Sequence, residues 1–180
     1  MKGEKLFLVT GGAHGTGLAI IKQLAKTILR QGGKRSTVLF TSRQENFKAA
    51  QIAEKKLMRE FDGKVGFEAF GMDLLNRNDI RHTVHHVQKR FGKVDSIIHN
   101  AGGYHEPRPP ALLDEVGRKV LMQRAHEMVV TNYHGPKLLT ESLLRYMDDD
   151  GKILFISSHL SDITSTSFYP DMKLPDRRPL

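Results

Sequence analysis

The stretch that decides the fold is LFLVTGGAHGTGLAIIKQLA, residues Leu6–Ala25. It opens with the apolar, β-branched run Leu6–Thr10, which predicts a short buried strand. A glycine-rich break, TGGAHGTG at Thr10–Gly17, follows, and apolar residues then return at helical spacing over Gly15–Arg30. A helix that begins directly after a glycine-rich turn leaves its first backbone N–H groups free for a phosphate group. The break therefore predicts a phosphate-binding loop, with a tight turn that binds nothing as the alternative.

The rest of the chain keeps alternating between short apolar segments and segments with helical periodicity. Strands that are apolar throughout are buried on both faces, and strands separated by helices run parallel. We therefore predict an α/β fold in which a doubly wound parallel sheet lies between two layers of helices. The further predicted strands are Thr37–Thr41, Val65–Phe70, Val94–Ala101 and Ile153–Ser157, and the further predicted helices are Glu45–Phe61, Asp79–Phe91 and Arg118–Met147.

Two of these helices carry specific expectations. The segment Arg118–Met147 predicts one long helix or two abutting ones, with a kink at Pro136 because proline lacks the N–H that continues a helix. The segment Glu45–Phe61 predicts an amphipathic helix. Its expected core-facing residues are Ala49, Ile52, Leu57 and Phe61.

Composition narrows the class of protein. The chain has 180 residues, a net charge of +8 and no cysteine, so disulfides, thiolate metal sites and cysteine nucleophiles are excluded. Its basic residues are spread without a long block, and we expect no nucleic-acid partner. No segment is apolar enough to span a membrane and the N-terminal residues lack the pattern of a signal peptide, which makes the cytoplasm the default location. We expect one domain over residues 1–180, with an irregular tail at 160–180.

Several short motifs follow one another in a fixed order along the chain. They are TGGAHGTG at Thr10–Gly17, MDLLN at Met72–Asn76, HNAG at His99–Gly102, TNYHG at Thr131–Gly135 and GKILFISS at Gly151–Ser158. Together they resemble the motifs of the short-chain dehydrogenase/reductase family, although His99 departs from that family's NNAG. The resemblance implies a Rossmann-type domain that binds a nicotinamide dinucleotide. Within the family the chain is most similar to the monomeric NADPH-dependent carbonyl reductases.

The resemblance also implies a set of cofactor contacts. Gly11 and Gly15 would allow a tight turn and the close approach of a pyrophosphate, and Gly17 would let the helix pack against the first strand. After the second strand, Arg43 stands where an acidic residue would accept hydrogen bonds from the ribose of NAD(H). A guanidinium suits a 2′-phosphate in charge and geometry, so NADP(H) is the expected cofactor. The implied cofactor-binding residues are Gly11, Gly12, His14, Gly15, Thr16, Gly17, Arg43, Asp73, Leu74, Asn100, Ala101 and Gly102.

For catalysis, the resemblance implies that Ser158 binds a carbonyl oxygen and that Asn132 positions a water relay. The family's proton donor is a tyrosine with a lysine four residues later, and Tyr169 and Lys173 match this spacing. Pro170 follows the tyrosine directly, so the same segment could instead begin an insertion that precedes the true pair. The implied reaction is the NADPH-dependent reduction of a small carbonyl compound, a ketone, aldehyde or quinone. The alternative is a non-catalytic module that binds NADP or a partner.

The remaining expectations concern the C-terminal third of the chain and a group of histidines before it. Family members continue beyond the fifth strand, so we expect this chain to be an incomplete form. The run Ile153–Ile156 would then lie at an uncovered sheet edge, where self-association could occur. The three histidines His82, His85 and His86 have helical spacing that could bind a metal, but we expect a solvated helix face and no metal site. We expect Asp148–Asp150 to form a solvated turn.

Overall fold

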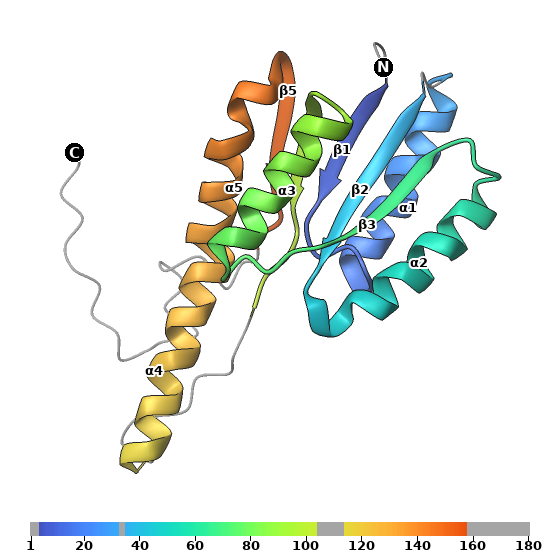
Figure 1. Ribbon diagram of the computed structural model, residues 1–180. Coiled ribbons are helices and arrows are strands. Elements are labelled where there is room, and N and C mark those ends of the chain that lie inside the picture. The colour runs from blue at the N-terminus through green and yellow to red at the C-terminus, as the bar shows by residue number, and fades with distance from the viewer. Residues whose placement is uncertain (1–3, 33–34, 104–113, 158–180) are drawn as a thin grey trace.

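A computed structural model describes residues 4–32, 35–103 and 114–157 of the chain. The predictions that concern Ser158, Tyr169, Lys173 and the tail at 160–180 lie outside these residues. Five parallel strands form one sheet in the order β3-β2-β1-β4-β5 (Figure 1). The predicted parallel α/β fold is therefore confirmed. The strands are β1 (Lys5–Val9), β2 (Ser36–Ser42), β3 (Gly66–Gly71), β4 (Val94–His99) and β5 (Met147–Phe155).

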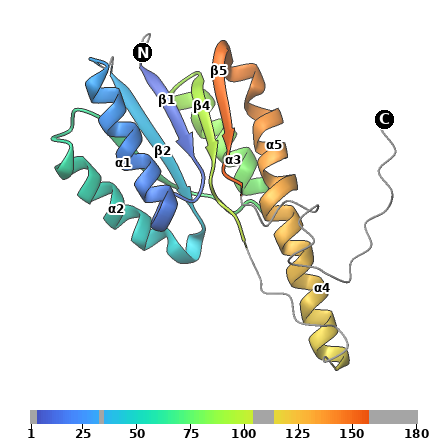
Figure 2. The same ribbon diagram turned by 180° about the vertical axis from the view of Figure 1, so that it is seen from behind.

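Helices cover both faces of this sheet. The pair α1 and α2 packs on one face and the pair α3 and α5 on the other, which gives three layers (Figures 1 and 2). Each face has its own apolar cluster, with Phe40 central to the first and Leu139 to the second. The helices are α1 (Gly15–Arg30), α2 (Phe47–Glu60), α3 (Arg77–Arg90), α4 (Glu115–Val129) and α5 (Gly135–Leu143), and the short turns are η1 (Gln44–Asn46), η3 (Val130–His134) and η4 (Leu144–Tyr146).

The core-facing stripe of α2 differs from the prediction. Leu57 and Phe61 are buried as expected, but Ala49 is exposed and the exposed fraction of Ile52 is 56%. The buried positions are instead Ala50 and Ala53, which lie two turns and one turn before Leu57. Their methyl groups let the helix lie close to the sheet, whereas the prediction followed the larger apolar side chain.

The long helical segment breaks into two helices at a π-helical turn. The turn η3 spans Val130–His134 and ends directly before Gly135 and Pro136. Because Pro136 has no N–H to donate to the carbonyl four residues earlier, the regular ladder cannot pass through this point. Of the two predicted forms, the structure therefore has two abutting helices, α4 and α5, joined by the turn η3.

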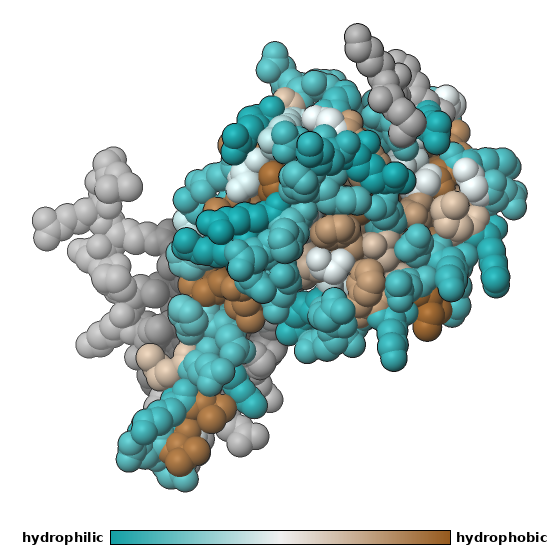
Figure 3. Space-filling model, viewed as in Figure 1, coloured by the Kyte–Doolittle hydropathy of each residue, from teal (hydrophilic) through white to brown (hydrophobic). Residues whose placement is uncertain are grey.

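Helix α4 projects away from the sheet (Figures 1 and 2). No residue of α4, which is described in full, is buried. Its apolar side chains Val116 and Met122 are 69% and 71% exposed, and brown side chains mark this helix in Figure 3. Neither α4 nor any other helix in the described ranges is long and apolar enough to cross a membrane.

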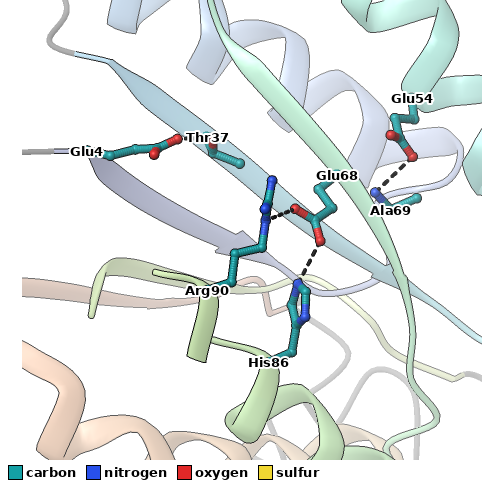
Figure 4. A network of polar contacts seen from close by, with 7 residues as sticks. All are labelled: Glu4, Thr37, Glu54, Glu68, Ala69, His86 and Arg90. Carbon is teal, nitrogen blue, oxygen red and sulfur yellow. Dashed lines mark hydrogen bonds and ion pairs between the residues drawn. The ribbon is translucent and has the colours of Figure 1, made fainter. Parts of the chain in front are cut away.

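The two edge strands of the sheet, β3 and β5, differ in how far other groups cover them. At β3, the backbone N–H of Ala69 donates to Glu54 Oε2 of α2 at 3.1 Å, so a side chain caps part of this edge (Figure 4). At β5, Leu154 and Phe155 are 46% and 57% exposed. The expectation of an uncovered edge at β5 is therefore confirmed for the described residues.

The acidic segment Asp148–Asp150 is not the predicted turn. It belongs to β5, where the pairing with β4 shifts between Val94 and Ser96 and leaves the extra residues outside the ladder. The segment is exposed as expected, and Lys93 Nζ lies 2.5 Å from Asp148 Oδ2.

The histidines of α3 are only partly on a solvated face. His82 and His85 are exposed, but His86 Nε2 lies 2.6 Å from Glu68 Oε1, and Arg90 Nε donates to Glu68 Oε2 at 2.8 Å (Figure 4). The neighbouring strand β3 supplies this carboxylate, so helical spacing alone could not reveal it. In the described part of the chain, no three histidine or acidic side chains are grouped closely enough to hold a metal ion.

Candidate functional site

A cavity of about 580 Å³ lies where the strands β1, β2, β3 and β4 end. The sheet order reverses direction between β1 and β4, because β2 and β3 lie on one side of β1 and β4 lies on the other. Ligands of open α/β sheets bind at such a reversal, outside the carboxyl ends of the strands. The cavity therefore occupies the position that the fold itself favours for a ligand.

The cavity gathers nearly all of the predicted cofactor residues from four separate loops. Those that line it are Gly11, His14, Gly15, Thr16, Gly17, Arg43, Asp73, Leu74, Asn100, Ala101 and Gly102. Gly12 is the exception, since it is buried and does not line the cavity. A Cβ atom on Gly12 would lie 2.6 Å from Ile21 Cδ1 and 2.6 Å from Phe40 Cβ. The structure thus gives Gly12 a packing position against Ile21 and Phe40, and its cofactor contact stays a prediction.

The glycine-rich turn leaves open space at the N-terminus of α1. Gly15 has a φ of +55°, and apart from its chain neighbours and the backbone of α1, no described atom lies within 4 Å of where its Cβ would be. Gly17 is the opposite case, because a Cβ there would lie 2.1 Å from Gly11 O. The first turn of α1, which is described in full, carries no acidic residue, and His14 precedes it without a side-chain cap. The positive end of the helix therefore faces the cavity through Gly15 and is suited to an anion.

A hydrogen-bond brace joins the ends of β1 and β4 beneath this turn. Asn100 Nδ2 donates to Thr10 O at 3.1 Å and to Gly11 O at 3.0 Å. Thr10 Oγ1 accepts from the backbone N–H groups of Asn100 at 3.1 Å and Ala101 at 3.0 Å. Because Thr10 is fully buried, these bonds hold the two loops at one separation. The sequence marked Asn100 but gave no sign that Thr10 is its partner.

The rim after β2 carries polar and basic groups. Arg43 lines the cavity together with Thr41, Ser42 and Asn46, which were not among the predicted cofactor residues. Their positions at the end of β2 and in the following turn could have indicated them, because ligands of open α/β sheets bind outside the carboxyl ends of the strands. Arg43 Nη2 lies 2.9 Å from Glu45 Oε1, and both side chains are largely exposed.

The wall after β3 is built around Asp73 and Leu74. Asp73 Oδ1 accepts from Leu75 N at 2.9 Å, while Asp73 N donates to Asp79 Oδ2 at 3.0 Å. These two hydrogen bonds fix the turn after β3. Leu74 is buried, and a Cβ on Gly135 would lie 2.6 Å from Leu74 O. The wall thus rests directly on the start of α5.

The predicted catalytic residue Asn132 lies beside the cavity, in the π-helical turn η3. Its Oδ1 accepts from Gly103 N at 2.8 Å and its Nδ2 donates to Gly103 O at 2.9 Å. Its neighbour Thr131 lines the cavity, but Asn132 itself does not. The amide therefore clamps the loop after β4, and the second predicted catalytic residue, Ser158, lies outside the described residues.

His99, the departure from the NNAG pattern, is a buried neutral imidazole. Its exposed fraction is 3%, and its Nε2 lies 2.8 Å from Thr140 Oγ1. None of the described residues bonds to Nδ1, and the ring stacks on Phe155 with a centroid separation of 4.5 Å. Burial lowers the pKa of His99 from 6.5 to about 4. His99 is not among the described residues that line the cavity.

Comparison with known proteins agrees with this geometry. Residues 5–170 match the short chain dehydrogenase family, and the chain belongs to that family. A 3-oxoacyl-acyl-carrier-protein reductase from Buchnera aphidicola is 27% identical over 162 residues, which cover 89% of this chain and 57% of that protein. The (-)-isopiperitenone reductase of Mentha piperita is 27% identical over 194 residues, covering 89% of this chain and 58% of the relative. The chain thus spans little more than half the length of these curated relatives.

Solved structures share the fold. A short chain dehydrogenase from Burkholderia cenocepacia in complex with NADP superposes with a TM-score of 0.71 at 24% identity, over 92% of this chain and 61% of the other. A blue fluorescent protein from a metagenomic library, in complex with NADPH, has a TM-score of 0.70 at 23% identity, over 89% of this chain and 58% of the other. At this level of identity the similarity establishes the doubly wound fold.

Proposed function

We propose that this chain binds NADP(H) and acts as a reductase of carbonyl compounds such as ketones, aldehydes or quinones. The observation that carries the proposal is the open N-terminus of α1 at Gly15, which faces a cavity whose rim after β2 holds Arg43. Among the residues at that rim, Thr41, Ser42, Arg43 and Asn46, none is acidic. A dinucleotide with an extra phosphate on its ribose is the ligand whose charges match both positions.

Each part of the dinucleotide has a counterpart in the cavity. The backbone N–H groups from Gly15 to Gly17 would hold the pyrophosphate, and Arg43 would hold the 2′-phosphate. The buried Leu74 would support the adenine, with Asp73 at its edge. The basic net charge of +8 would draw such a polyanion toward the protein.

The bound cofactor would supply the hydride for carbonyl reduction. The chain's own part begins with Asn132, which fixes the loop at Gly103 and so shapes the end of the cavity that follows β4. Ser158 stays a prediction as the residue that binds the carbonyl oxygen. Tyr169 and Lys173 stay candidates for the proton donor and its neighbouring cation.

Binding is tested by the change in NADPH fluorescence on mixing with the protein. We expect Gly15→Asp to abolish the change, because a carboxylate would occupy the space of the pyrophosphate and repel it. Gly63→Asp is the matched control, since Gly63 has a φ of +64° and, apart from its chain neighbours, no described atom within 4 Å of its Cβ position. Equal binding by the two variants, or no fluorescence change with the folded wild-type protein, would refute the proposal.

A non-catalytic dinucleotide-binding module is the second candidate. It is favoured by the fact that every described residue lining the cavity precedes β5 in the chain. Turnover separates the two functions: a reductase oxidises NADPH when a quinone or aldehyde is added, and Ser158→Ala lowers that rate. NADPH binding without turnover would assign the chain to the second function.

A further inference from the structure

The residue that pairs with Arg43 has no role in the function proposed above. Arg43 comes directly after β2 and precedes η1 (Gln44–Asn46), and Asn46 N donates to Arg43 O at 2.9 Å. This turn brings Glu45 back toward Arg43, so that Glu45 Oε1 lies 2.9 Å from Arg43 Nη2. The two side chains are 56% and 63% exposed.

The pair contributes little to folding, because exposed ion pairs are solvated and screened. Its position gives it another consequence. Arg43 lines the cavity, whereas Glu45 is not among the described lining residues, so a ligand in the cavity could contact the guanidinium while the carboxylate is paired with its Nη2. An anion bound to Arg43 from the cavity side would share the guanidinium with a second negative charge.

We propose that Glu45 sets how strongly Arg43 discriminates between phosphorylated and unphosphorylated ribose, an inference that rests on the proposed NADP(H) site. Glu45 positions the guanidinium over the rim and also repels the 2′-phosphate that the guanidinium binds. The preference for NADP(H) over NAD(H) is therefore smaller than Arg43 alone would produce. Glu45 acts through Arg43 and touches no ligand, so it is a positioning residue.

Coulomb's law gives the size of the effect. A carboxylate and a phosphate dianion bound to opposite sides of one guanidinium are roughly 6 Å apart, in a solvated environment with a dielectric constant near that of water. Screening at physiological ionic strength leaves about a threefold loss of affinity, which grows to about sevenfold at 0.01 M salt. The neutral 2′-hydroxyl of an unphosphorylated ribose feels almost none of this repulsion.

Isothermal titration calorimetry with two small nucleotides isolates this effect. Adenosine 2′,5′-bisphosphate and adenosine 5′-phosphate differ only in the 2′-phosphate. Glu45→Gln removes the charge but keeps an oxygen that can accept from Arg43. We expect this variant to bind the bisphosphate about threefold more tightly at physiological salt, more so at low salt, and to bind the monophosphate unchanged.

The matched control is Glu60→Gln, which removes an equivalent exposed charge from the pair between Lys22 and Glu60, at 2.7 Å. It changes the net charge by the same amount, but its partner Lys22 does not line the described cavity, whereas the partner of Glu45, Arg43, does, so neither affinity should change. An equal change for both nucleotides, no change for either, or the same gain in Glu60→Gln would overturn the role of Glu45. If Arg43→Ala leaves the bisphosphate affinity of the protein unaltered, the NADP(H) site itself is wrong and the inference falls with it.

Discussion

Acid should destabilise this protein through His99. In the folded state burial lowers the pKa of His99 from 6.5 to about 4, and none of the described residues accepts a hydrogen bond from its Nδ1. The unfolded chain therefore binds a proton at His99 below pH 6.5 that the folded protein excludes until about pH 4. Above pH 6.5 this difference in proton binding does not lower the free energy of unfolding. The free energy of unfolding then decreases as the pH falls toward 4.

The expected loss is about 3 kcal/mol, from 1.36 kcal/mol for each unit of the pKa shift. The assay is urea unfolding followed by circular dichroism at several pH values, for the wild-type protein and for His99→Asn. Asparagine does not titrate in this range, so the variant lacks this part of the pH dependence. At pH 7 the variant should be less stable, because it loses the stacking on Phe155 and the bond to Thr140.

The decisive quantity is the difference in unfolding free energy between the two proteins. Between pH 7 and pH 4 it should move by about 3 kcal/mol in favour of His99→Asn. A difference that stays constant across this range would show that the imidazole of His99 titrates normally in the folded protein. The reasoning from burial would then be refuted.

Three further predictions concern packing and the sheet edge. Gly17→Ala should destabilise the fold by about 1–3 kcal/mol and abolish NADPH binding, because its Cβ would lie 2.1 Å from Gly11 O. Urea unfolding measures the first effect and NADPH fluorescence the second. Gly135→Ala should cost a similar amount and weaken NADPH binding, because its Cβ would push on Leu74 O at 2.6 Å; unchanged binding would mean that the wall does not depend on α5. Leu154→Lys should reduce self-association in sedimentation experiments and change stability by no more than about 0.5 kcal/mol, since the side chain is 46% exposed on an edge strand.

Local patterns in the chain were sufficient to predict the sheet and most helix boundaries. The predicted helix Gly15–Arg30 coincides with α1, and the predicted strand Thr37–Thr41 lies within β2. These elements are defined by apolar periodicity and by glycine at a turn, which act over neighbouring residues. The open turn at the N-terminus of α1 could be predicted for the same reason, because a glycine-rich turn and a helix N-terminus are consecutive in the chain, and phosphate binding there stays a prediction.

Contacts between distant segments could not be predicted in this way. Glu68 reaches His86 because β3 lies beside α3, and Thr10 meets Asn100 because β1 lies beside β4. Part of the core-facing side of α2 was also mispredicted, since Leu57 and Phe61 are buried as expected but Ala49 and Ile52 are exposed. Residue size favoured Ile52, but close approach to the sheet favours small side chains such as Ala53.

The amino-acid sequence by itself determined the alternating parallel fold, the glycine-rich turn and the basic residue after the second strand, since each depends on residues that are adjacent in the chain. Only the tertiary structure decided that Gly12 packs beneath the loop and that Asn132 clamps Gly103. It also decided that His99 is buried without a partner for Nδ1 among the described residues. These outcomes depend on which groups meet across the sheet, and burial, hydrogen bonding and pKa are set by those neighbours.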